Sequence, residues 1–163
     1  MDKKMFCFQC EQTVGCAGCT GNSGVCGKKA DTARLQDELT GALIGLARAV
    51  DSTTAISKRT GQVIIEGLFT TVTNVNFDDV SIENMIQKVR AEKERLVPDC
   101  SKCQSPCVKT DEYDMQQLWN ANEDIRSLKS LILFGIRGMA AYAYHAYVLN
   151  YEDTEVNRFF CEA

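Results

Sequence analysis

The chain has 163 residues, nine cysteines and a formal net charge of −4 at pH 7. A domain of this length can bury a sufficient apolar core without crosslinks, so the cysteines are not needed to staple the fold. The acidic balance argues against nucleic acid and against an anionic membrane surface as partners. No apolar run reaches the roughly 20 residues that a membrane span requires, and no secretory signal is recognisable, so we expect a cytoplasmic protein.

The first 30 residues predict a cysteine-rich loop. They show neither helical nor strand periodicity, and five cysteines alternate with glycines that let the backbone turn tightly. We expect a single domain over 1–163, in which the 1–30 loop is attached to a helical bundle over 31–163.

The next three segments have apolar residues at spacings of three and four, which is typical of amphipathic helices. The pattern predicts helices over 31–50, 60–73 and 81–96. Asp31 and Ser81 are the expected capping residues, and Pro98 ends the third helix because it cannot donate the backbone hydrogen bond.

A loop over 98–113 contains both prolines of the chain and forms the clearest internal boundary. Cys100, Cys103 and Cys107 have the spacing C-x2-C-x3-C, which would suit a second metal site that lacks one ligand. Cys16, Cys161 or a water could complete that site. The alternative that we favour, by roughly two to one, is reduced thiols on an exposed loop, with Lys102 and Lys109 nearby to favour the thiolates.

The carboxyl-terminal half predicts further helices after a short piece over 114–119. The segment 123–149 is apolar on all sides, so we expect a central helix packed by several neighbours, with Gly135 and Gly138 allowing close contact. A last helix over 154–163 carries Phe159 and Phe160 without an evident packing partner, and the chain stops within it as an excised fragment would. The fold class is an all-α bundle of about four to five helices.

The spacing of the first cysteines indicates a metal centre. Cys7, Cys10, Cys19 and Cys26 read as C-x2-C-x8-C-x6-C, with Cys16 as a fifth thiol inside the second gap. Four cysteines can hold a [4Fe–4S] or a [2Fe–2S] cluster, and tetrahedral zinc is equally compatible with this spacing. Disulfides would need an oxidising compartment, and nine cysteines would leave one unpaired.

Four blocks in order resemble the amino-terminal helical region of hybrid cluster proteins, also called prismanes or hydroxylamine reductases. They are MFCFQCEQT, CTGNSGVCGKKADTARLQDELTGALIGL, GLFTTVTNVNFDD and NEDIRSLKSLILFGIRGMAAYAYHAYVL. The resemblance implies an iron-sulfur cluster near the domain surface, [4Fe–4S] more than [2Fe–2S], that passes electrons inward. It implies Cys7, Cys10, Cys19 and Cys26 as ligands, and the CTGNSGVCGK block favours Cys19 over Cys16.

Members of that family continue into two further domains, which carry the hybrid iron-sulfur-oxygen cluster where hydroxylamine or nitric oxide is reduced. The resemblance therefore implies that this chain transfers electrons and is not catalytic alone. The implied partners are an electron-donor protein and the remaining domains, and a homodimer through exposed apolar helix surface is a further expectation. Two alternatives stay open: a zinc-stabilised helical module that binds another protein, and a thiol redox switch at the CSKC pair of residues 100–103.

Overall fold

The computed structural model describes residues 5–10, 18–50, 56–72, 76–97 and 111–163. The described residues form six helices and no strand, and their one isolated bridge joins Cys7 and Cys19. The helices are α1 (Ala30–Ala49), α2 (Lys58–Thr70), α3 (Asp79–Leu96), α4 (Met115–Trp119), α5 (Glu123–Val148) and α6 (Thr154–Glu162). The prediction of an all-α fold is confirmed, with more helices than the four to five expected.

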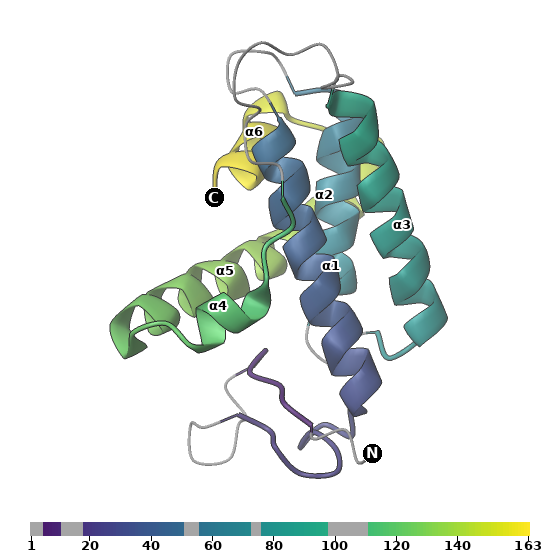
Figure 1. Ribbon diagram of the computed structural model, residues 1–163. Helices are drawn as coiled ribbons and strands as arrows, with labels where there is room; N and C mark the ends of the chain where they lie inside the picture. Colours follow the sequence, from purple (N-terminus) through teal and green to yellow (C-terminus); the bar gives the residue numbers. More distant parts are fainter. Residues whose placement is uncertain (1–4, 11–17, 51–55, 73–75, 98–110) are drawn as a thin grey trace.

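Helices α1, α2 and α3 lie side by side and form the main bundle (Figure 1). The predicted apolar stripes face one another, and Leu39, Leu46 and Ile82 at their centre have no exposed surface. Each helix therefore buries the face that its sequence periodicity predicted.

Both predicted capping residues were wrong by two or three positions. Helix α1 begins at Ala30 after Lys29, so Asp31 lies in its first turn and is not its cap. Helix α3 is capped by Asp78, whose carboxylate accepts a hydrogen bond from the Val80 amide, so Ser81 lies inside the helix. An acidic side chain in either place still stabilises the positive end of the helix dipole.

Helix α5 is not the central helix that its composition predicted. It crosses the bundle and extends beyond it (Figure 1), packing mainly against α2. Its buried residues are Ser130, Arg137 and Ala140, whereas Leu128 and Leu131 are 63% and 68% exposed. A side chain added at Gly135 or Gly138 would meet nothing within 4 Å, so these glycines do not serve a helix contact in this structure.

Helix α6 corrects another expectation. Phe160 is buried in the main core, where it joins residues of α1, α2 and α3, while Phe159 remains half-exposed. The two neighbouring rings therefore have different environments, and Phe160 is the ring that anchors the helix, together with the buried Asn157.

The segment before α4 crosses α1 at close range. The Tyr113 amide donates a hydrogen bond to the carbonyl of Gly41 at 3.1 Å, and any side chain at position 41 would collide with the Tyr113 backbone. Glycine is therefore required at that helical position. The crossing brings Trp119 of α4 against α1, where Phe8 of the amino-terminal segment also packs. The predicted 98–113 loop, with Cys100, Cys103 and Cys107, lies outside the described residues except at 111–113.

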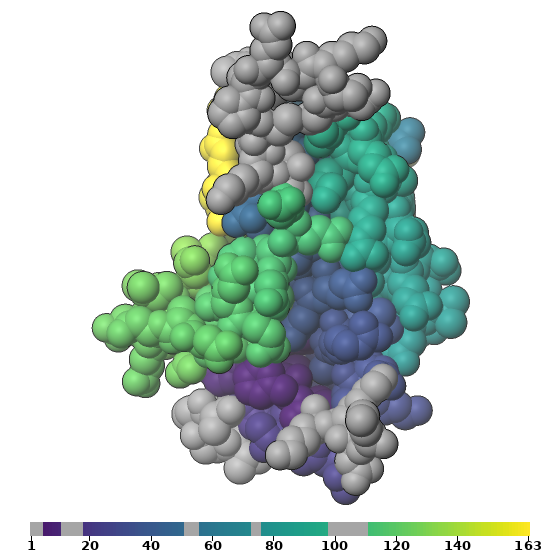
Figure 2. Space-filling view, in the orientation of Figure 1, coloured from purple at the N-terminus to yellow at the C-terminus, as the bar shows by residue number. Residues whose placement is uncertain are grey.

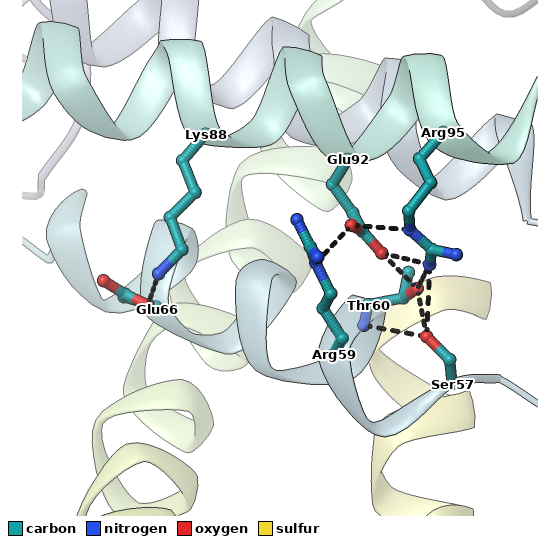
Figure 3. Close-up of polar contacts among 7 residues, drawn as sticks. All are labelled: Ser57, Arg59, Thr60, Glu66, Lys88, Glu92 and Arg95. Atoms are coloured by element: carbon teal, nitrogen blue, oxygen red, sulfur yellow. Dashed lines mark hydrogen bonds and ion pairs between the residues drawn. The ribbon is translucent and has the colours of Figure 1, made fainter.

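A buried carboxylate joins α2 to α3 (Figure 3). Glu92 has no exposed surface and binds Arg95 at 2.6 Å and Arg59 at 2.9 Å. The Thr60 hydroxyl donates to the same carboxylate at 2.7 Å, and Ser57 caps α2 by accepting from the Thr60 amide. Hydrogen bonds from Arg95 dominate in holding the pKa of Glu92 below its ordinary value, against the opposing effect of burial.

No helix in the described ranges is both long and apolar enough to cross a membrane.

Candidate functional site

The four predicted ligands lie in the described part of the loop, which is found at the end of the bundle where α1 begins (Figure 1). Cys7 and Cys19 are buried and Cys10 and Cys26 are half-buried, and all four are free thiols. Cys16, the alternative third ligand, lies outside the described residues.

Backbone pairing holds Cys7 beside Cys19. The amide of Cys7 donates to the carbonyl of Cys19 at 3.1 Å, and the Cys19 amide donates back at 2.8 Å. Directly paired residues of an antiparallel bridge have neighbouring side chains, so the two thiols lie next to each other. Gly18 precedes the bridge with φ of +92°, a conformation that favours glycine.

A tight turn places the fourth cysteine. The Gly24 amide donates to the carbonyl of Lys28, and the Gly27 amide donates back to the carbonyl of Gly24, both at 2.8 Å. A side-chain carbon at Gly24 would lie 3.4 Å from the sulfur of Cys26 and 3.5 Å from the methyl group of Met5. The turn therefore brings the Cys26 thiol to the side of Gly24 on which Met5 lies.

Aromatic packing fixes the opening segment under α4 (Figure 2). The rings of Phe6 and Phe8 lie 6.0 and 5.6 Å from the ring of Trp119. Because Phe6 and Phe8 flank Cys7, the position of this thiol is tied to the helical bundle.

A buried polar cluster lies between the loop and α1. The ammonium group of Lys28 donates to the side-chain carbonyls of Gln9 at 2.8 Å and Gln36 at 2.5 Å, and lies 4.0 Å from the sulfur of Cys7. The Gln9 amide group donates to the carboxylate of Asp37 at 2.7 Å and to the carbonyl of Ala33 at 3.2 Å. We call Gln9, Lys28, Gln36 and Asp37 the Lys28 cluster.

Arg137 of α5 adds a second buried cation. It donates to the hydroxyls of Thr71 at 3.0 Å and Thr40 at 2.9 Å, which joins α5 to α2 and α1. Burial lowers the pKa of Arg137 to about 10, so the guanidinium stays charged at neutral pH. Burial also raises the pKa of Asp37, against the opposing hydrogen bond from Gln9.

Burial is also the main influence on Cys7 and raises the pKa of its thiol, while the ammonium group of Lys28 lowers it. The Gln9 backbone amide lowers it as well, by donating a hydrogen bond to the sulfur. A metal ion that binds the thiolate would remove the unfavourable effect of burial, because it supplies the compensating charge directly.

The donor set suits a metal centre by its chemistry. Thiolates are the ligands of iron-sulfur clusters and of structural zinc, and the paired backbone of Cys7 and Cys19 already holds two of them together. Within the described ranges no three side chains of Cys, His, Asp or Glu converge closely enough to hold a metal ion. Cys10 and Cys26 therefore do not complete a group of three with the Cys7–Cys19 pair in this structure.

Sequence reasoning missed the Lys28 cluster and Arg137. A local signal existed for part of it, because Gln36 and Thr40 interrupt the apolar stripe of the first helix at buried positions. Buried polar side chains need partners, so these two residues could have indicated a polar site beside the helix.

Residues 5–163 match the model of the Prismane/CO dehydrogenase family. The chain belongs to this family, and its resemblance to the hybrid cluster proteins is thereby confirmed.

Curated relatives named hydroxylamine reductase share 37% identity in Clostridium perfringens, 39% in Porphyromonas gingivalis and 41% in Thermodesulfovibrio yellowstonii. The alignments cover 97%, 98% and 98% of this chain, and 32%, 32% and 33% of the relatives. The chain therefore spans about a third of the length of the curated relatives that it matches.

Proposed function

We propose that this chain is an electron-transfer domain that carries an iron-sulfur cluster, [4Fe–4S] more than [2Fe–2S], on Cys7, Cys10, Cys19 and Cys26. The observation that supports it most is the backbone-paired Cys7 and Cys19, buried next to the ammonium group of Lys28. A bound cluster would accept and release single electrons. In the cytoplasm, an electron-donor protein would supply them.

The chain's own residues have three roles in this proposal. The cysteine thiolates bind iron, the Gly24–Lys28 turn folds Cys26 back toward the opening segment, and α1 with the rings of Phe6 and Phe8 excludes water from one side. The hydrogen bond from the backbone amide of Gln9 to the Cys7 sulfur is of the kind that adjusts the reduction potential of a cluster. The domain therefore needs a stable cage and no substrate pocket.

Iron and sulfide analysis tests the proposal. Protein purified without oxygen is expected to be brown, to contain about four iron and four sulfide ions per chain for a cubane cluster, and to bleach on reduction. A colourless protein that contains zinc would contradict it, because zinc has a filled d shell. Two iron ions per chain would indicate the smaller cluster.

We further propose that a longer protein with this domain reduces hydroxylamine or nitric oxide at a hybrid iron-sulfur-oxygen cluster in its remaining domains. Two findings support these separate roles: the relatives are named hydroxylamine reductase, and this chain covers about a third of their length. Hydroxylamine reduction by the 163-residue chain alone, at a rate comparable to that of a longer relative, would contradict it.

The exposed face of α5 is the surface that we propose to contact those remaining domains. Exposed apolar side chains follow one another on α5 at intervals of three, four, seven and three residues. They are Ile125, Leu128, Ile132, Met139 and Tyr142. Such a stripe is the seam on which a second helix packs. An apolar stripe of this length is costly to leave in water, and the relatives have additional chain that can cover it.

Without those domains, we expect the stripe to pair with a second copy. Light scattering of the 163-residue chain should give the mass of a dimer, and Leu128→Glu should return it to a monomer with unchanged helix content. Val80→Glu is the matched control, because Val80 is similarly exposed but lies on α3. A protein that is monomeric at all concentrations, or equally dissociated by Val80→Glu, would contradict pairing through α5.

A further inference from the structure

Lys28 is a buried cation whose hydrogen-bond acceptors are neutral. Its side chain is 2% exposed, and its ammonium group donates to the carbonyls of Gln9 and Gln36. None of the ion pairs among the described residues includes Lys28. A buried ammonium without an anion costs several kcal/mol, so this arrangement calls for a negative charge nearby.

Asp37 does not supply that charge alone. The Gln9 side chain lies between Asp37 and Lys28: it accepts a hydrogen bond from Lys28 and donates one to Asp37. Asp37 also interacts with the guanidinium of Arg137. Lys28 and Arg137 are two cations, and Asp37 is one anion. These three described side chains together therefore carry one positive charge in excess.

The Lys28 ammonium also faces the ring of Phe77, 6.0 Å away, and the sulfur of Cys7. The sulfur lies 4.0 Å from the nitrogen, and both side chains are buried. A metal-bound Cys7 is a thiolate, so it would supply the missing negative charge at this position. A pair of opposite charges at this separation interacts more strongly inside a protein than in water.

We propose that Lys28 is the countercharge of the Cys7 thiolate and raises the reduction potential of the cluster. This inference rests on the proposed function. Reduction adds one electron from the donor to the cluster and therefore one negative charge, which a fixed cation nearby stabilises. Lys28 is thus a positioning and tuning residue that contacts a ligand and need not contact iron.

The neighbouring Lys29 provides a matched control. It carries the same charge one residue further along the chain, but its side chain is exposed and makes no capping hydrogen bond at the start of α1. Water and salt screen an exposed charge, so Lys29 should influence the cluster far less than Lys28 does.

The experiment uses the 163-residue chain, reconstituted without oxygen with iron and sulfide, in the wild type and in Lys28→Met, Lys28→Arg and Lys29→Met. Iron content and visible absorption are measured first, and the midpoint potential is then measured by a dye-mediated redox titration. We expect Lys28→Met to lower the equilibrium constant for reduction at least tenfold, which is 59 mV for a one-electron couple. Lys29→Met should leave the potential unchanged, and Lys28→Arg should remain near the wild type.

Each other outcome is decisive. If Lys28→Met loses iron while Lys28→Arg keeps it, the positive charge is needed to hold the thiolate, which supports the countercharge. If Lys28→Met keeps its iron at an unchanged potential, or if both Lys28 variants lose iron while their helix content equals that of the wild type, the inference is wrong and Lys28 serves only to hold Gln9 and Gln36 in place. A wild type without iron overturns the proposed function itself, and this inference with it.

Discussion

Replacing Cys7 by serine is expected to abolish iron binding by the reconstituted chain. Cys7 is buried, is paired with Cys19 and lies beside the Lys28 ammonium, so its loss would remove a proposed ligand and the thiolate that we propose as the anion of this buried cation. Changing even an outer-shell partner of a metal ligand costs about 10- to 100-fold in affinity, so we expect a loss of more than about tenfold. Iron and sulfide per chain, with visible absorption, measure it.

The matched control is Cys161→Ser in α6. Cys161 is half-buried beside the main core, in α6 and outside the loop with the four candidate ligands, and burial raises the pKa of its thiol to about 11. This variant should keep its iron. Equal iron in Cys7→Ser and the wild type, or equal loss in both variants, would contradict the assignment of Cys7.

Removal of the Glu92 carboxylate has the largest effect on stability that we expect outside the loop. Glu92→Ala breaks hydrogen bonds to Arg95, Arg59 and the Thr60 hydroxyl, and bonds to charged groups contribute roughly 1.5–3 kcal/mol. Because Arg59 and Arg95 are 69% and 44% exposed, they return to water and do not remain as buried charges. We therefore expect a loss of about 2–3 kcal/mol in the free energy of unfolding, measured with denaturant.

The same carboxylate makes stability depend on pH. Its pKa is below the ordinary value of 4.5 in the folded chain. Its contribution is therefore complete above about pH 4.5 and is lost as the pH falls through the lower pKa of the folded state. Glu92→Gln should weaken this dependence of stability on pH.

The exposed ion pair between Glu66 and Lys88 is the control for burial (Figure 3). Glu66→Gln breaks this pair and should lower the free energy of unfolding by less than about 1 kcal/mol. Equal losses in the free energy of unfolding for Glu92→Ala and Glu66→Gln would contradict the role of burial.

The three helices of the main bundle could be predicted because their signal is local. An apolar stripe at spacings of three and four identifies both the helix and the face that it buries, as for Leu39 and Leu46 of α1. The position of α5 could not be predicted, because a helix that is apolar on all sides looks the same whether its own chain surrounds it or a further domain does. Leu128 and Leu131, which that composition placed inside, are exposed in this structure.

The candidate site divides in the same way. The spacing of the cysteines identified the thiols, and the family resemblance supplied the type of cluster that they would hold. The Lys28 cluster depends on contacts between the loop and α1, and Arg137 reaches Thr40 across 97 residues of sequence. Pairings at that distance leave little trace in a single sequence, so the charged surroundings of the cysteines emerged only from the fold.

The packing of Trp119 has a practical consequence. It is the only tryptophan of the chain, its ring touches Phe6 and Phe8 on either side of Cys7, and its indole nitrogen donates to Asp37 at 3.4 Å. Its fluorescence is therefore an intrinsic optical reporter of whether the cysteine loop is seated on the bundle. The natural protein can thus be followed during assembly in real time, without an attached dye.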